Sequence, residues 1–329
     1  MKMLLNAAFC LLLLCYGWPI VFAQTARSPE ILKPKTYKPP VIVADSGLSD
    51  VLSTTIESTL MIFAAKGLKR EEISATLIDM SDPKQLKSAS FRGNDQMYTA
   101  SVVKMFYMAA LERQLEDGKL KMSPELERGL KDMIVDSSNE ATQYVLDVIT
   151  GTSSGAELPA KQFEGWQHKR NRVNRYFASM GYTNINVNQK TFCEDAYGIE
   201  QQSRKYKGEN RNMLTTDATA RLMAEIVSGN IAPKARTDAM MSLLKRDPFA
   251  KDGNSQGVNF IGKALIDEKL TDAKLWSKAG WTSKMRHDAA YIELADGSIF
   301  VLVVFTENHA NDFDIIPNIA KVIITAMKK

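Results

Sequence analysis

Hydrophobic residues recur at helical spacing through the middle of the chain and gather in short runs near both ends. Residues 48–65 carry apolar positions three and four apart and stop at Gly67, which predicts an amphipathic helix. Two short apolar runs follow at residues 73–80 and 85–91, separated by a turn at Asp82-Pro83, and they predict strands. The chain therefore opens with one helix and two strands.

The middle of the chain has almost no strand pattern. Helical periodicity predicts helices over residues 100–116, 124–135, 139–149, 170–180, 216–227 and 234–244. Strand patterns return at 274–279, 289–294 and 299–306, followed by a last helix over 314–327. Strands from both ends with helices between them predict an α/β (α+β) fold, in which helices flank an antiparallel sheet and an all-helical region is inserted.

The first 23 residues resemble a secretory signal. Lys2 precedes a short apolar run, and Ala23 offers a small residue at a cleavage position. That run is about half of the ~20 residues that cross a bilayer, which favours cleavage over a retained anchor. We therefore expect an exported protein, periplasmic or secreted, without stable membrane insertion after cleavage. The prolines of residues 24–45 predict an extended linker.

Composition narrows the function classes. The chain is 45% hydrophobic and 24% charged, which excludes a disordered protein, and its net charge of +4 gives no sign of a nucleic-acid partner. Once the signal is removed Cys193 is the only cysteine, so we expect it to fill a small buried or half-buried position. The three histidines lack metal-ligand spacing, and we expect neither metal nor cofactor.

Ser101 and Lys104 form a candidate nucleophile and base. Residues three apart share a helix face, so the lysine amine can reach the serine hydroxyl at the first turn of the predicted helix. Lysine acts as a base only when its pKa is lowered, for example by burial. The same spacing recurs at Ser81 and Ser242, so the pair alone is a weak signal.

Two later segments supply partners in order. Ser137 and Asn139 stand between two predicted helices, where they either face a cleft or cap the following helix. Lys278 and Gly280 end a predicted strand, where the lysine is either a cation of the site or a charge that protects a sheet edge.

Together these segments resemble the S-x-x-K, S-x-N and K-T-G motifs of the serine β-lactamases and penicillin-binding proteins. Similar segments surround them, so the chain resembles a class A β-lactamase over roughly residues 46–329. The resemblance implies a β-lactamase/transpeptidase-like fold, with a sheet subdomain at about 46–97 and 270–329 and a helical subdomain at about 98–269.

The resemblance also implies roles for the motif residues. Ser101 would be acylated, Lys104 would be its base or proton relay, and Ser137 would pass a proton to the leaving nitrogen. Asn139 would orient the substrate amide, and Lys278 would attract the substrate carboxylate and polarise Ser137. Past Gly280, the backbone N–H of Trp281 would complete an oxyanion hole with that of Ser101.

The chain departs from class A in the omega loop, where that class has a Glu and, four residues on, an Asn that hold the deacylating water. Glu194 is a tentative catalytic residue, because Gly198 stands where the Asn belongs. Ala279 also replaces the middle Thr of K-T-G. The omega-loop departure predicts slow deacylation, and Ala279 removes one possible contact with the substrate carboxylate.

The sequence thus predicts an exported serine hydrolase that acts as a monomer on a β-lactam or related amide. Two alternatives remain open: a peptidoglycan DD-peptidase, which takes a peptide substrate, and a penicillin- or cell-wall-binding protein without turnover.

Overall fold

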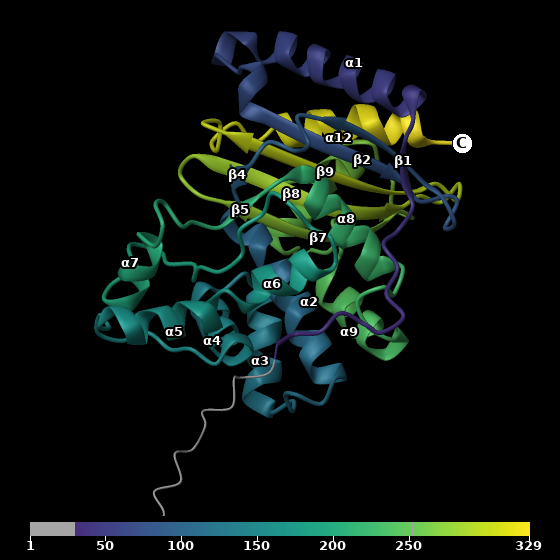
Figure 1. Ribbon diagram of the computed structural model, residues 1–329. Helices are drawn as coiled ribbons and strands as arrows, with labels where there is room; N and C mark the ends of the chain where they lie inside the picture. Colours follow the sequence, from purple (N-terminus) through teal and green to yellow (C-terminus); the bar gives the residue numbers. More distant parts are fainter. Residues whose placement is uncertain (1–29, 252) are drawn as a thin grey trace, which may run out of the picture.

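The computed structural model describes residues 30–251 and 253–329, and its centre is a seven-stranded sheet with helices on both faces (Figure 1). The predicted signal, residues 1–23, lies outside the described residues. The strand order across the sheet is β1 (Ile42–Ala44), β3 (Leu86–Phe91), β2 (Ile73–Asp79), β9 (Ile299–Glu307), β8 (Met285–Glu293), β7 (Lys274–Trp281) and β6 (Lys245–Arg246).

The sheet is assembled from both ends of the chain, as predicted. Strand β2 pairs with β9 in antiparallel register, with Ala75 opposite Val304, and all five predicted strands are present. The structure adds β6 and β1, and β1 runs parallel to β3, so the sheet is mixed rather than purely antiparallel.

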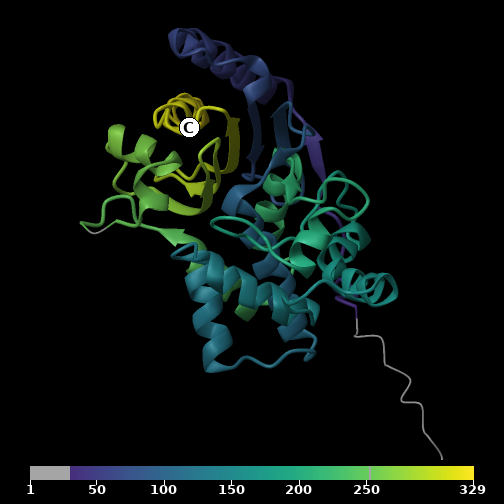
Figure 2. The same cartoon turned by 90° about the vertical axis from the view of Figure 1, so that its left-hand side faces the viewer.

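Strand β9 shows why both faces of the sheet are covered. Leu302 and Val304 point into a core shared with α1 (Ser46–Ile62), α11 (Ile261–Asp267) and α12 (Ile315–Met327). Val301, Val303 and Phe305 point to the opposite core, shared with α2 (Val103–Glu116) and α8 (Thr216–Val227). Because successive side chains of a strand alternate between faces, an uninterrupted apolar run is a strand buried on both sides. Figure 2 shows α1 and α12 together, on the side away from the lower helices.

The helical region lies below the sheet and surrounds α2, whose residues from Val103 to Leu115 are all buried. Against it pack α3 (Pro124–Ile134), α4 (Asn139–Thr150), α6 (Arg172–Ser179) and α9 (Lys234–Leu244). Helix α5 (Ala160–Arg170) packs on α4 and α6 and is joined to α7 (Ile199–Arg204), whereas α10 (Ser255–Val258) packs on α11 and β7. Two short strands, β4 (Met97–Tyr98) and β5 (Met213–Leu214), pair separately beneath the sheet. Helices α5, α7, α10 and α11 escape the sequence analysis.

Residues 30–45 of the proline-rich segment pack against the domain, and residues 42–44 join the sheet as β1. Ile31 is buried, and the hydroxyl of Tyr37 donates a hydrogen bond of 2.7 Å to Glu225 on α8. Among the described residues, no helix combines the length and the apolar character needed to cross a bilayer.

Candidate active site

Ser101 lies in a tight turn that joins β4 to α2. The turn is a short 3-10 helix, Ala100–Val102, and Ala100 has a φ of 44°. Such a left-handed conformation is uncommon for a residue with a side chain, and backbone strain of this kind clusters at functional sites. The turn leaves Ser101 half-buried at the N-terminal end of the central helix, where developing negative charge is favoured.

Gly280 brings the end of β7 directly against this turn. A Cβ atom at this position would lie 2.6 Å from the backbone nitrogen of Ser101 and 2.9 Å from that of Val102. Only glycine therefore permits the approach. The next residue, Trp281, ends β7 and has 45% of its surface exposed, so the end of this strand lies beside the backbone of Ser101.

Lys104 lies fully buried, one helical turn after Ser101. Its Nζ donates hydrogen bonds to the carbonyl oxygen of Ser137 and, at 2.9 Å, to Oδ1 of Asn139, and it lies 3.4 Å from the Ser137 hydroxyl. Burial lowers the pKa of Lys104 to about 7, and the charges of Glu140 and Cys193 oppose that decrease. The amine is therefore available as a base near neutral pH.

The turn into α4 places Ser137 and Asn139 beside the amine of Lys104. The residue that caps α4 is Ser138, whose hydroxyl accepts a hydrogen bond of 3.1 Å from the backbone of Ala141. Neither Ser137 nor Asn139 is used as the cap, so the capping alternative does not apply to them. Ser137 itself has a φ of 59°, a second left-handed residue in the site.

Lys278 joins the group from the sheet side. Its Nζ lies 2.9 Å from the hydroxyl of Ser137, 2.6 Å from Oε1 of Gln256 and 2.7 Å from the carbonyl of Ala279. The side chain is fully buried, so it does not protect an exposed edge. Burial lowers the pKa of Lys278 well below its usual range, the nearby charges of Lys104 and Arg246 lower it further, and the charge of Asp288 opposes the decrease. An ammonium group has three protons, and these three acceptors can use all of them, so Lys278 is held against Ser137 by a hydrogen bond.

Six of the eight predicted site residues thus make direct contacts, in one group of four and one pair. Hydrogen bonds join Lys104, Ser137, Asn139 and Lys278, and Gly280 touches the Ser101 turn.

The omega-loop region places Cys193, not Glu194, against this group. The amide of Asn139 contacts the Cys193 sulfur at 3.4 Å, and Cys193 is exposed, so the expectation of a buried position is wrong. Glu194 is also exposed and points into a neighbouring cavity of about 750 Å³ that Tyr98, Arg211 and Thr282 help to line.

Gly198 has a structural reason for replacing the family's Asn. Its φ is 54°, and a Cβ atom there would lie 2.1 Å from the carbonyl oxygen of Gly155. A side chain at this position is therefore excluded by packing, and the loop contains no amide at this point to share in holding a water.

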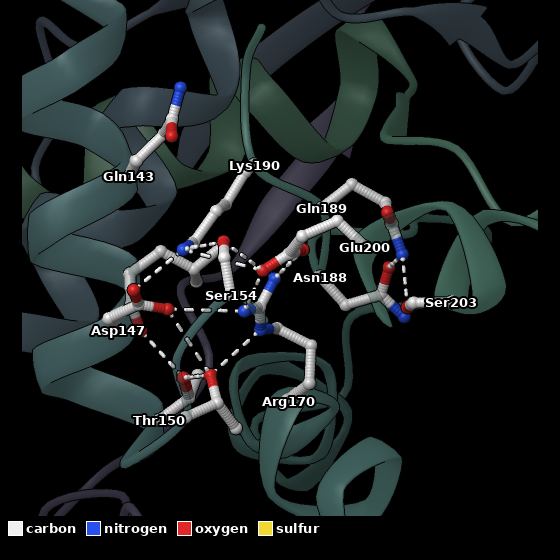
Figure 3. Close-up of polar contacts among 12 residues, drawn as sticks. Gln143, Asp147, Thr150, Ser154, Arg170, Asn188, Gln189, Lys190, Glu200 and Ser203 are labelled. Carbon is white, nitrogen blue, oxygen red and sulfur yellow. Dashed lines mark hydrogen bonds and ion pairs between the residues drawn. The ribbon is translucent and has the colours of Figure 1, made fainter. Parts of the chain in front are cut away.

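A buried polar cluster anchors the loop (Figure 3). Arg170 at the end of α5 donates two hydrogen bonds, of 2.7 and 2.8 Å, to the carboxylate of Glu200 on α7. Lys190 in the loop donates one of 2.6 Å to Asp147 on α4. Arg170 and Glu200 are 0% and 1% exposed. Arginine and carboxylate bonded at two points form a geometrically specific pair, so the cluster fixes the path of the loop between residues 190 and 200.

Three features of the site escape sequence reasoning. Gln256 lies in a four-residue helix without a periodic pattern, and Cys193 has no second cysteine or histidine nearby to draw attention to it. The residues of the anchoring cluster come from four segments of the chain, so no single stretch of sequence contains it. The sequence shows only two charged residues, Arg170 and Glu200, on helices whose patterns are otherwise ordinary.

Comparisons with known proteins agree with this geometry. A family model described as the beta-lactamase enzyme family matches residues 57–327. No curated protein sequence matches the chain.

Solved structures share the fold at low identity. A β-lactamase from Sphaerobacter thermophilus is 19% identical, with 83% of this chain and 97% of that chain covered and a TM-score of 0.61. One from Chitinophaga pinensis is 18% identical, with 83% and 99% covered and a TM-score of 0.60. A structure named PBP-A is 15% identical, with 88% and 98% covered and a TM-score of 0.57.

Proposed function

The chain belongs to the β-lactamase enzyme family, and we propose that it is an exported serine hydrolase that opens a β-lactam or related amide through an acyl-enzyme on Ser101. The observation that carries the proposal is the buried amine of Lys104, held beside Ser137 and Asn139 one turn from Ser101. In a family of serine hydrolases the nucleophile is a serine, and Ser101 is the serine one helical turn before the buried lysine.

In the proposed acylation step, the Ser101 hydroxyl passes its proton to neutral Lys104 while its oxygen bonds to the substrate carbonyl carbon. The carbonyl oxygen takes the electron pair of the double bond and accepts hydrogen bonds from the N–H groups of Ser101 and Trp281. When this intermediate collapses, the C–N bond breaks and the nitrogen takes a proton from Ser137. Lys104 returns its extra proton to Ser137, which restores the starting charges.

We propose that release of the acyl group is slow. Hydrolysis needs a base that takes a proton from the attacking water. Glu194 is the carboxylate that the resemblance assigns to this task, but Cys193 occupies the contact with Asn139, and Gly198 supplies no amide. These features support an enzyme that is acylated faster than it is deacylated.

Time-resolved intact-mass spectrometry of the mature protein mixed with a penicillin tests the proposal. We expect an adduct of one penicillin that persists and then decays. A stable adduct without decay would favour the DD-peptidase reading, in which a peptide amine takes the acyl group. If no adduct forms, the chain is a binding protein and the proposal is wrong.

Ser101→Ala should remove the adduct and preserve the unfolding temperature. Ser242→Ala is the matched control, because Ser242 has the same Ser-x-x-Lys spacing but lies exposed on α9, far along the chain from the other motifs. Labelling that survives in Ser101→Ala would contradict the assignment. Mass analysis of the exported protein also tests the signal: we expect it to begin at Gln24.

A further inference from the structure

Gln256 is a buried amide that touches both walls of the active site. Its side chain is 1% exposed and lies in α10, between the sheet and the helical region. Its Oε1 accepts hydrogen bonds from Nζ of Lys278 at 2.6 Å and from the backbone N–H of Ala279 at 3.2 Å. One oxygen therefore holds both the side chain and the backbone of the strand that carries the site lysine.

The amide nitrogen of Gln256 bonds to the helical side of the site, at the end of α3. Nε2 of Gln256 donates hydrogen bonds to the carbonyl of Val135 at 2.8 Å and to that of Ile134 at 3.3 Å. These carbonyls lie at the C-terminal end of α3. The last carbonyls of an α-helix have no hydrogen-bond partner within the helix itself. Ser137 follows two residues later, so the amide reaches the loop that carries the second site hydroxyl.

Neighbouring side chains share this capping. Asn254 donates to the carbonyl of Val135 at 2.8 Å, and Arg246 donates to that of Ile134 at 3.1 Å. Gln256 is the member of this group that also bonds to Lys278. Loss of its side chain would therefore leave the end of α3 partly capped but would remove a direct link between Lys278 and the Ser137 loop.

We propose that Gln256 is a positioning residue, which holds the Lys278 amine against the hydroxyl of Ser137 and joins the strand of the site to the end of α3. The inference rests on the proposed function, because it deepens the account of the same site. Gln256 does not contact the reacting atoms and acts through Lys278.

The chemistry of the position calls for a neutral amide. Lys278 is faced by Lys104 from α2 and Arg246 from β6, which disfavour its charge, and by Asp288 from β8, which favours it. A glutamate at 256 would add a second negative charge and lose the donor that caps α3. A leucine would remove the acceptor and leave a buried amine with one partner fewer.

Three variants separate positioning from simple structural support. Gln256→Glu and Gln256→Leu change the contact with Lys278 in opposite directions. Gln114→Leu is the matched control, because Gln114 is also buried and donates to the carbonyl of Ile149 near the end of α4 at 3.1 Å, without touching a site lysine.

The first readout is the rate of acylation by a fluorescent penicillin across pH 5 to 10. Loss of a hydrogen bond to a charged group predicts a fall of about ten- to hundredfold in Gln256→Leu and a rate near that of the wild type in Gln114→Leu. If the two leucine variants lose the same stability and both keep the wild-type rate, the inference is wrong.

The second readout does not need acylation, so it remains decisive if the wild type forms no adduct and the proposed function fails. Lysine Cε resonances of ¹³C-labelled protein are titrated by NMR, with Lys278→Met assigning the signal. We expect Lys278 to titrate at higher pH in Gln256→Glu, at lower pH in Gln256→Leu and as in the wild type in Gln114→Leu. An identical titration in all four proteins would overturn the inference.

Discussion

Acylation of Ser101 should depend on an ionisation near neutral pH, because burial lowers the pKa of Lys104 from 10.5 to about 7. A decrease of about 3.5 in pKa corresponds to about 5 kcal/mol of difference between the two protonation states. At pH 7 it raises the neutral fraction of the amine from roughly 0.03% to about half, on the order of a thousandfold. The burial of one side chain thus supplies most of the free base that the reaction needs.

The direction of the pH effect follows from the role of the amine. Only neutral Lys104 can take the proton of Ser101, so the acylation rate should rise as pH increases through about 7 and level off above it. Below the inflection the rate should fall about tenfold per pH unit, as the neutral fraction does. Stopped-flow measurement of a single turnover with a fluorescent penicillin between pH 5 and 9 gives this profile.

Glu140→Gln provides an internal check on the cause. The negative charge of Glu140 raises the pKa of Lys104, so its removal should move the inflection to lower pH. Glu127→Gln, an exposed carboxylate in the first turn of α3, is the matched control and should leave the inflection in place. A rate that does not vary between pH 5 and 9, or an inflection near 10, would refute the assignment of Lys104 as the base.

Three further predictions address other parts of the site. Lys278→Ala should lower acylation by about ten- to hundredfold for a penicillin and much less for a neutral ester, measured as kcat/KM; equal losses would exclude an effect of charge on the substrate carboxylate. Glu200→Gln should cost about 3–5 kcal/mol in urea unfolding, because it removes the charge bonded at two points to buried Arg170 and leaves Asp147 as its remaining carboxylate, whereas Glu268→Gln in a partly exposed pair should cost less than about 1 kcal/mol. Glu194→Gln should leave both formation and release of the acyl group close to the wild-type rates, because Glu194 lines a neighbouring cavity and Cys193 takes the contact with Asn139; release slowed by about 10²-fold or more would make Glu194 the deacylating base.

The sequence predicts the fold wherever an element carries its own pattern. Helix α1 and strand β9 are long and periodic or continuously apolar, and both are found within a few residues of their predicted bounds. Strands β1 and β6 have three and two residues and exist only because β3 and β7 lie beside them. Such short strands are defined by their partners, so no local pattern predicts them.

The same distinction applies to the site. Ser101 and Lys104 are predictable because their spacing on one helix brings them together, and the later motifs follow in family order. Gln256 is not, because its role arises only where α10, β7 and the end of α3 meet. The residues beside Gln256 in the sequence form no pattern that predicts these contacts.

In the omega-loop region, a shift of the backbone by one residue would change which side chain contacts Asn139. Cys193 and Glu194 are adjacent, and only the path of the backbone determines which one meets Asn139. Glu200 holds that path from one side through Arg170, and Gly198 holds it through its contact with Gly155. Breaking the pair between Arg170 and Glu200 should therefore change the rate of acyl release as well as stability, because a loop freed by one residue could bring the carboxylate of Glu194 to the position that the thiol now occupies.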